Sequence, residues 1–337
     1  MSRVRFHQFS SPDPFSDSVT IYNGRPGMDR LLTNMICMPQ FDCLYHEDGS
    51  RAPETCIRRG HDLKIESIGP PQIEVPERIE RHESPLIYLG TFAWNFWGHF
   101  LTEGLSRVWC LRHCSELSDL HGIYFTRPGD FPWLPHMSAF LRHSDLDERR
   151  LMRCESPLLL RQVHVPGPSM VNRNHAFSDH TESHAIVAQR ICGDPPARRS
   201  EQPVYISRRR LPELHRKIVR EDRLERELAA AGVRIVCPEQ MPFDDQVRLF
   251  VSHRIFIGSI GSGFHSLLFA PRDGTSRTIV FCDHRVNANY RIVDELQHIE
   301  ADYINCLYID PTSRKTDPDR ILDVDMALHH LVRLGIL

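Results

Sequence analysis

The sequence predicts an α/β fold with a doubly wound parallel sheet, and the evidence lies between residues 203 and 284. Short runs of β-branched and aromatic residues alternate there with segments of helical periodicity. A glycine-rich turn follows one of the predicted strands. Strands that alternate with helices of this length imply parallel pairing, with helices packed on both faces of the sheet.

The elements of this stretch follow one another in a regular order. Leu224, Leu228 and Ala231 share one helical face, and Gly232 occupies the usual place of a helix C-cap. A second helix repeats the same period through Val247 and Phe250. The expected strands are 204–207, 233–237, 254–258 and 278–282, and the expected helices are 221–231, 244–252 and 265–269.

Outside this stretch the pattern is less regular. A strand at 86–89 leads to an aromatic-rich helix, which is predicted to continue over 105–111. Residues 170–177 are expected to form a polar loop, either solvated or in contact with an acceptor. Residues 193–203 are rich in proline and charge, which makes them the best candidate for a linker between domains. A C-terminal helix is predicted at 321–337.

Two features are expected at the carboxyl ends of strands, where sheets of this type bind ligands. Arg208–Arg210 directly follows one strand, and the turn Gly258–Gly263 joins another strand to a helix. Guanidinium groups, backbone N–H groups and a helix N-terminus all favour an anion such as a phosphate or diphosphate. The alternative is that the glycines serve only a tight strand-to-helix turn.

A second candidate site lies in the aromatic-rich helix. Asn95, His99 and Glu103 are spaced four residues apart and would share one helical face. Polar side chains among so many aromatic residues are costly to bury unless they form hydrogen bonds. The spacing alone leaves two interpretations open, a satisfied buried histidine and a catalytic group.

An ordered series of short motifs resembles glycosyltransferase family 61, over roughly residues 85–285. The motifs are Tyr205-Ile-Ser-Arg208, Glu221, Pro238-Glu239, Gln246, Phe250, Ile257-Gly258, Gly261-Ser-Gly263 and Leu268-Phe269-Ala-Pro271. The resemblance implies a GT-B architecture, in which two Rossmann-like α/β domains face a cleft. The domains would be 1–195 on the acceptor side and 196–320 for the nucleotide sugar, with a C-terminal helix at 321–337 that either crosses back or packs locally.

The resemblance also implies an activity. The chain would be an inverting hexosyl- or pentosyltransferase that moves a sugar from a nucleotide-diphosphate donor, expected to be UDP-linked, to a saccharide or other hydroxyl acceptor. The setting would be bacterial polysaccharide or glycan biosynthesis, and no metal or other cofactor is expected. His99 would be the base or would orient it, with Glu103 as its partner and Asn95 completing the motif; the reverse assignment of His99 and Glu103 stays open. The expected donor contacts are Arg208, Arg209, Glu221, Gly258, Gly261, Ser262, Gly263, His265 and Ser266.

The sequence departs from the family pattern at three positions. Ile260 stands where the family usually has a histidine, and Arg220 stands where an asparagine commonly precedes the helix glutamate. Phe281 stands where a glutamate is common on the last strand, unless Asp283 or His284 takes its place. These departures keep a second hypothesis open, a catalytically silent relative that binds nucleotide sugar or glycan within a biosynthetic complex.

Composition indicates the class of protein, its possible partners and its location. The chain has 337 residues, 41% of them hydrophobic and 25% charged, with a net charge of −3, as in an ordinary globular protein. Nothing in this balance suggests nucleic acid as a partner. We expect a cytoplasmic protein, at most peripheral to the inner membrane. The N-terminus has no apolar core of signal-peptide length, and no apolar stretch is long enough to span a membrane. The ten cysteines include no C-x-x-C pair and are expected to be reduced thiols. Oligomeric state stays open, with a homodimer as one alternative.

Overall fold

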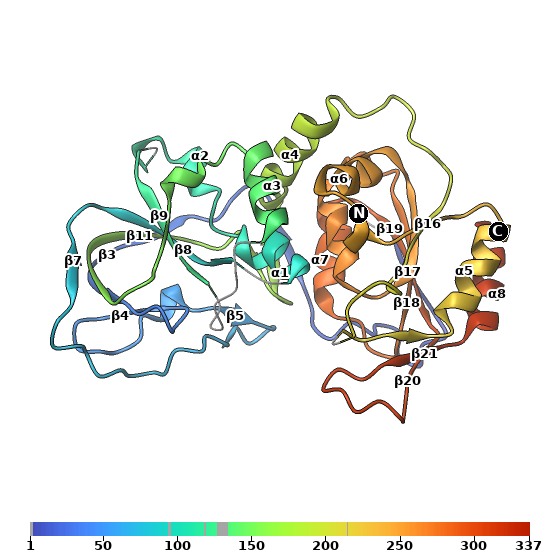
Figure 1. The fold of residues 1–337 in the computed structure, drawn as a ribbon, viewed down its shortest axis with the longest axis horizontal. Coiled ribbons are helices and arrows are strands. Elements are labelled where there is room, and N and C mark those ends of the chain that lie inside the picture. The colour runs from blue at the N-terminus through green and yellow to red at the C-terminus, as the bar shows by residue number, and fades with distance from the viewer. Residues whose placement is uncertain (1–2, 94–95, 118, 127–133, 214) are drawn as a thin grey trace. The chain divides into compact units, whose positions relative to one another are not determined.

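The computed structural model describes residues 3–93, 96–117, 119–126, 134–213 and 215–337. The chain forms two compact units (Figure 1). Unit 1 consists of Met1–Ser16 and Ile191–Leu337, and unit 2 consists of Asp17–Arg190. Each unit is a mixture of helices and strands, so the prediction of an α/β chain is confirmed.

Unit 1 is built on a six-stranded sheet in which every neighbouring pair is parallel. This confirms the parallel sheet predicted from the alternation of strands and helices. In sheet order the strands are β1 (Val4–His7), β19 (Glu300–Asn305), β18 (Arg277–Cys282), β17 (Ile255–Ser259), β14 (Val204–Ile206) and β16 (Arg234–Val236).

The order of the strands creates a switch point between β14 and β17. From β14 the chain moves outward to β16, then returns past β14 to β17 and continues in the opposite direction through β18 and β19. The two strands are in register with Ile206 beside Gly258. The segments that follow these strand ends therefore leave the sheet next to each other, which is where open α/β sheets bind ligands.

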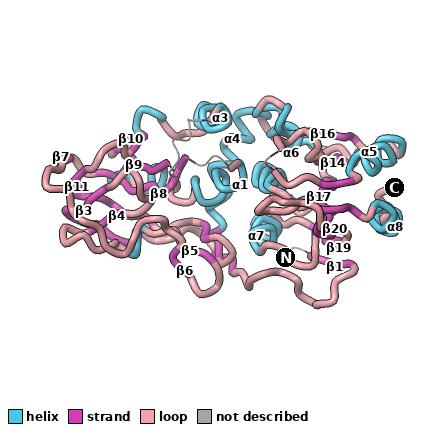
Figure 2. The backbone as a smooth tube through the Cα atoms, turned by 60° about the horizontal axis from the view of Figure 1, so that its bottom comes forward, coloured by secondary structure: helices cyan, strands magenta, loops and turns pink. Residues whose placement is uncertain are grey.

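Helices cover both faces of this sheet. Figures 1 and 2 show α5 and α8 side by side on one face, and α6 and α7 on the other. Leu224 and Leu228 of α5 are fully buried, and Gly232 ends the helix with φ of 84°, as the sequence predicted. The helices are α5 (Glu221–Ala230), η6 (Pro238–Gln240), α6 (Phe243–Ser252), η7 (Ser262–Phe269, a 3₁₀ helix), α7 (Ala288–Leu296) and α8 (Val324–Arg333).

The C-terminal prediction was wrong in its first residues. Residues 320–322 form a strand, and α8 begins only at Val324 because Asp323 caps it by accepting a hydrogen bond from the Met326 N–H. The strand belongs to a small sheet with the order β15 (Ile218–Val219), β21 (Arg320–Leu322) and β20 (Leu307–Ile309).

Unit 2 has a larger, mixed sheet. Its strands β10, β9, β8 and β11 are parallel, whereas β3 and β4 are antiparallel to their neighbours. In sheet order the strands are β10 (Leu151–Arg153), β9 (His121–Thr126), β8 (Leu86–Ala93), β11 (Leu158–Pro166), β3 (Met28–Cys37) and β4 (Leu44–Tyr45), with β7 (Glu80–His82) also paired to β11.

The aromatic-rich helix is shorter and differently wound than predicted. Helix α1 (Trp97–His99) passes directly into a π-helix, η2 (Phe100–Gly104), in which the Leu105 N–H reaches the Phe100 carbonyl. Residues 105–109 form turns, so the continuous helix predicted over 105–111 was wrong. The other helical segments of unit 2 are η1 (Pro53–Thr55), α2 (Cys110–His113), η3 (Ser115–Leu117), α3 (Pro135–His143), η4 (Glu148–Arg150), η5 (Ser178–Thr181) and α4 (Glu182–Cys192), whose last two residues belong to unit 1.

Residues 170–177 form a hairpin, where the sequence predicted a loop. Strands β12 (Met170–Val171) and β13 (His175–Phe177) pair antiparallel, and β2 (Thr20–Tyr22) extends the sheet. Arg173 adopts a φ of 58° at the tip. A further hairpin, β5 (Arg58–Arg59) with β6 (Lys64–Ile65), is joined to the first by a bridge between Arg59 and Asn172. The polar composition of both segments hid their strand character.

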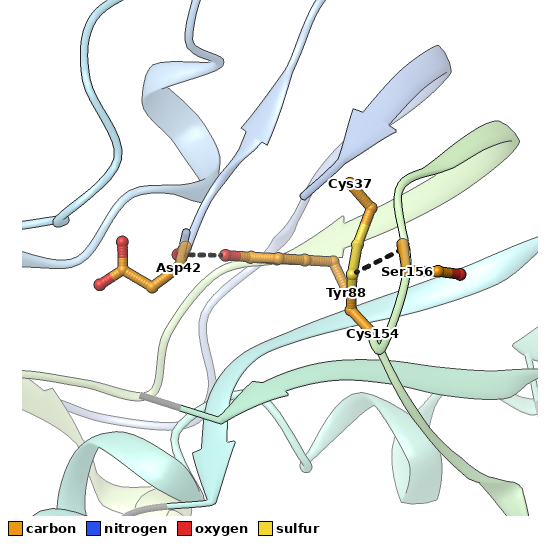
Figure 3. The surroundings of a disulfide bond; sticks show 5 residues. All are labelled: Cys37, Asp42, Tyr88, Cys154 and Ser156. Atoms are coloured by element: carbon orange, nitrogen blue, oxygen red, sulfur yellow. Dashed lines mark hydrogen bonds between the residues drawn. A yellow bond between two sulfur atoms is a disulfide. The ribbon is translucent and has the colours of Figure 1, made fainter. Parts of the chain in front are cut away.

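One pair of cysteines corrects the expectation that all ten thiols are reduced. Cys37 at the end of β3 and Cys154 after β10 form a disulfide, shown in Figure 3. Both residues belong to a buried hydrophobic cluster of unit 2. They are 117 residues apart in the chain, so no local spacing could reveal the pair. All ten cysteines lie within the described residues, and the other eight are free.

No helix in the described part of the chain combines the length and the hydrophobicity needed to cross a membrane.

Candidate functional site

His99 and Glu103 form a direct pair in unit 2. His99 is the last residue of α1, Glu103 lies within η2, and His99 Nδ1 is hydrogen-bonded to Glu103 Oε2. The sequence predicted that these side chains would meet, and they do so across the start of a π-helix. Asn95, the third member of the predicted motif, lies outside the described residues.

Two residues from neighbouring hairpins hold the other oxygen of this carboxylate. Arg59 Nη2 lies 3.4 Å from Glu103 Oε1, and the Asn172 side-chain amide donates to the same oxygen. Arg59 was missed from the sequence because it stands in a stretch without a recognisable motif. The local chain path explains the contact, since the bridge between Arg59 and Asn172 brings both hairpins to η2.

The surroundings keep Glu103 ionised. Its side chain is only 10% exposed, and burial by itself would raise the pKa. The hydrogen bond from His99 and the positive charge of Arg59 outweigh burial, so the pKa of Glu103 lies below its usual value. A fixed carboxylate beside Nδ1 sets the orientation of the imidazole and favours proton exchange at Nε2.

Two arginines meet at the switch point of unit 1. Arg208 follows β14, and its Nη2 lies 3.4 Å from the Arg216 carbonyl. Arg216 Nη2 donates to the Ile260 carbonyl at 3.0 Å, in the turn after β17. Sequence reasoning named Arg208 and missed Arg216, which is one of several arginines between residues 198 and 226.

The two guanidinium groups repel each other. Burial lowers the pKa of Arg208, and the positive charge of Arg216 lowers it further. Asp317 lies 3.5 Å from Arg216 Nη1 but is itself largely exposed. The Nε atoms of both arginines are buried and have no hydrogen-bond partner among the described residues. An anion bound here would relieve the repulsion and satisfy donors that are otherwise unused.

Glu221 holds the backbone at Arg208 in place through a buried carboxyl group. Its Oε1 accepts hydrogen bonds from the Tyr205 hydroxyl at 2.8 Å and from the Arg208 N–H at 3.1 Å. The residue is 1% exposed, and burial raises the pKa of its carboxyl to about 7. Glu221 therefore fixes the backbone from which Arg208 projects.

The three glycines after β17 leave room for strand β14 and the Arg208 side chain. Gly258, Gly261 and Gly263 all have φ values open to other residues. A Cβ at Gly261 would collide with Arg208 Nη1, and one at Gly258 would lie 3.0 Å from the Ile206 carbonyl oxygen. The interpretation that these glycines serve only the turn conformation therefore does not hold, because close approach of β14 and Arg208 requires them.

The remaining predicted donor residues are divided between two environments. Ser262 is exposed at the start of η7, whereas His265 and Ser266 are buried, and the His265 ring stacks on Tyr290 with centroids 5.1 Å apart. Arg209 turns to α5, where its Nη1 lies 2.8 Å from Glu225 Oε2. The structure thus brings Arg208 to the glycine turn and pairs Arg209 with a helix carboxylate.

One group of possible metal ligands occurs among the described residues. It comprises His113, Asp179 and Glu182 of unit 2, all half-buried. Arg25 lies 3.2 Å from Asp179, and Arg112 lies 3.4 Å from Glu182. Because arginines already neutralise both carboxylates, this cluster is better described as an ion-pair network.

The match to a known family covers residues of both candidate sites. The model described as Glycosyltransferase 61 matches residues 97–279, more than half of the chain. The matched range begins two residues before His99 and includes Glu103, Arg208, Arg216 and the turn Gly258–Gly263. A search of curated proteins found no match.

Proposed function

Because the chain belongs to the glycosyltransferase 61 family, we propose that it is an inverting glycosyltransferase with a nucleotide-diphosphate sugar as donor. The observation that carries this proposal is the pair Arg208 and Arg216 at the switch point of a parallel sheet. The family makes the chain a transferase, and the arginine pair supplies a site for its anionic donor. The sugar would be a hexose or pentose, UDP-linked, in a pathway of glycan biosynthesis.

The arginines would bind the diphosphate and stabilise it as it leaves. Negative charge builds up on the diphosphate as its bond to the sugar breaks, and fixed cations nearby lower the energy of that state. Arg208 and Arg216 would neutralise this negative charge in place of a divalent ion. The exposed N-terminus of η7 would add N–H donors. We therefore propose a mechanism that requires no metal.

His99 would act as the general base. In an inverting transfer the acceptor oxygen attacks the anomeric carbon as the bond to the diphosphate breaks, and the acceptor proton passes to the base. His99 Nδ1 is engaged by Glu103, so Nε2 is the nitrogen that would take the proton. Glu103 then stabilises the imidazolium that forms. This assigns the base to His99 and its orientation to Glu103, with Asn95 proposed as a further member.

We also propose the GT-B arrangement that the family implies. The arginine pair belongs to unit 1 and the His99–Glu103 pair belongs to unit 2. Transfer in a single displacement would require a donor bound by one unit to meet an acceptor bound by the other. The division into an acceptor-side domain and a donor domain is part of the same proposal.

Binding of nucleotides tests the donor site. The protein is heated with UDP-, GDP-, CMP- and dTDP-sugars and with the free nucleotides, without added metal. A ligand at 100 times its Kd stabilises the folded state by about 2.7 kcal/mol, which is readily seen as a rise in Tm. We expect one nucleotide family, UDP, to stabilise the protein. If none of them does so, the proposed donor site is wrong.

Turnover tests the base. His99→Ala should leave nucleotide-induced stabilisation unchanged and reduce sugar transfer by roughly 10² to 10⁴, the range for loss of a general base. Glu103→Gln should reduce transfer less, because the base remains and only its partner is weakened. Full turnover by His99→Ala would refute the assignment. A wild-type protein that binds nucleotide sugar but transfers nothing to any acceptor would favour the silent-relative hypothesis raised by Ile260 and Phe281.

A further inference from the structure

Unit 2 contains a cavity that borders the proposed catalytic pair. Its volume is about 340 Å³, and it lies among β8, η2, the β5–β6 hairpin and the β12–β13 hairpin. Glu103 and Asn172 belong to its wall. Glu103 is therefore shared between the cavity and its hydrogen bond to His99.

Thr91 provides an independent sign that the cavity binds a ligand. It lies on β8, lines the cavity and is 5% exposed. Its Oγ1 is buried and has no hydrogen-bond partner in the described part of the chain. A buried hydroxyl without a partner destabilises a protein by about 1–3 kcal/mol, so such groups call for an explanation.

The strand that carries Thr91 is locally irregular. The pairing of β8 with β9 shifts register between Tyr88 and Gly90 and again between Thr91 and Ala93. Gly90, which also lines the cavity, adopts a φ of 70°. Irregularities of this kind redirect side chains and are frequent beside functional sites.

The wall of the cavity combines hydrogen-bonding groups with apolar surface. Thr91, Glu103 and Asn172 offer hydroxyl, carboxylate and amide groups. Opposite in character are the side chains of Leu63, Met170 and Phe177, which also line the space. A sugar ring has the same two properties, because its hydroxyl groups project from the edge and its C–H groups form apolar faces.

We propose that this cavity binds a single terminal monosaccharide ring of the acceptor, with Thr91 as a specificity-determining contact. The volume lies near the lower end of the roughly 300–1,000 Å³ typical of ligand pockets, which suits one sugar ring. A ring hydroxyl bonded to Thr91 Oγ1 satisfies the buried group, and the ring then lies beside Glu103. This inference rests on the proposed transferase function, because it identifies the ring as acceptor.

Binding of methyl glycosides tests the proposal. Saturation-transfer NMR is recorded on the full-length protein with methyl glycosides of glucose, galactose, mannose, xylose, rhamnose and N-acetylglucosamine. We expect at least one of them to receive saturation. Thr91→Val, which removes the hydroxyl and keeps the shape, should weaken its binding roughly three- to tenfold, and Thr91→Ser should restore it to within about twofold.

The stability of the variants separates a ligand contact from a structural role. Thr91 Oγ1 makes no hydrogen bond to any residue that the structure describes, so Thr91→Val should not lower Tm. Thr278 of β18, in the other unit, is the matched control, because its Oγ1 is also buried and has no partner within the described ranges. Thr278→Val should leave glycoside binding unchanged.

Three results would overturn the inference: no saturation of any glycoside, equal affinity of Thr91→Val and wild type, or a loss of Tm in Thr91→Val. Nucleotide binding is measured in parallel as the test of the donor site. If nucleotides stabilise the protein and no glycoside binds, the cavity proposal fails and the donor proposal stands. If glycosides bind and no nucleotide does, the cavity binds sugar but the transferase proposal fails.

Discussion

Arg208 and Arg216 indicate a binding site only as a pair. Either guanidinium alone would be an ordinary half-buried arginine. Burial lowers the pKa of Arg208, and the charge of Arg216 lowers it further. The Nε atoms of both arginines are buried without partners among the described residues. The unfavourable charge pair is retained at the edge of the sheet where ligands bind, which is why we interpret it as an anion site.

The prediction at this scale concerns the donor affinity. Arg208→Ala and Arg216→Ala should each weaken nucleotide binding by roughly ten- to a hundredfold, since a charge-assisted hydrogen bond contributes about 1.5–3 kcal/mol. The Tm of the free protein should change little, because each substitution also removes the repulsion. Titration calorimetry measures the affinity. Arg209→Ala is the control, because Arg209 is paired with Glu225, and its affinity should stay near that of wild type.

The turn from β17 into η7 makes a sharper prediction at the scale of the element. Gly261→Ala would push against the end of the flexible Arg208 side chain, whereas Gly258→Ala would press on the Ile206 backbone and the Phe264 ring. We expect Gly261→Ala to reduce nucleotide binding as much as Arg208→Ala does, with little change in Tm. Gly258→Ala should lower Tm, since neither neighbour can move easily. Equal effects of the two substitutions on Tm would contradict this account.

The packing behind the α1–η2 segment predicts acid sensitivity. Burial lowers the pKa of His136, which contacts Trp97 and Phe100, to about 4, and it does the same for His180. A histidine with a lowered pKa in the folded state takes up protons preferentially when unfolded. Stability should therefore be complete above pH 6.5 and decline as the pH falls toward 4.

For His180, which is 4% exposed, the free energy of unfolding should fall by on the order of 3 kcal/mol between pH 7 and pH 4. Urea unfolding between pH 7 and pH 4.5, followed by tryptophan fluorescence, measures it. His180→Asn keeps a polar group near Ser169 and removes the titration, so its stability should vary less with pH. An unchanged pH dependence in this variant would exclude His180 as a source of the effect.

At the scale of the whole molecule, the N-terminus completes a sheet whose other strands come from the far end of the chain. Strand β1 pairs with β19, and Asp302 accepts hydrogen bonds from Arg5 at 2.6 Å and from Arg277 at 3.1 Å. His7 Nε2 lies 2.9 Å from the same carboxylate. Burial alone would raise the pKa of Asp302, but Arg5, Arg277 and the hydrogen bond to His7 hold it far below its usual value.

Removal of residues 1–9 should therefore destabilise unit 1. It would expose the edge of β19 and leave the buried Asp302 without its contacts to Arg5 and His7, so the free energy of unfolding should fall. Scanning calorimetry should show unit 1 unfolding at a lower temperature, with loss of nucleotide binding. Asp302→Asn in the full-length chain should produce a smaller shift in the same direction. A truncated protein with wild-type Tm would show that β1 contributes nothing to stability.

Much of this protein can be predicted from local sequence. The parallel sheet of unit 1 follows from alternating strands and helices, because each element carries its own period of apolar residues. The motifs around Arg208 and Gly261 likewise indicated the family that the comparison then showed. His99 and Glu103 were expected to meet, since residues four apart in a helix are neighbours.

Only the tertiary structure decided the remaining features. The contacts of Glu103 with Arg59 and Asn172, the pairing of Cys37 with Cys154 and the salt bridge of Arg5 with Asp302 join residues between 44 and 297 positions apart. That the Thr91 hydroxyl has no partner among the described residues can be seen only once its surroundings are known. A sequence records which groups can interact within one turn or one strand, whereas long-range contacts depend on how sheets and hairpins pack. For that reason the local sequence determined the fold class and the family of this protein, and the packing of distant segments decided the composition of its sites.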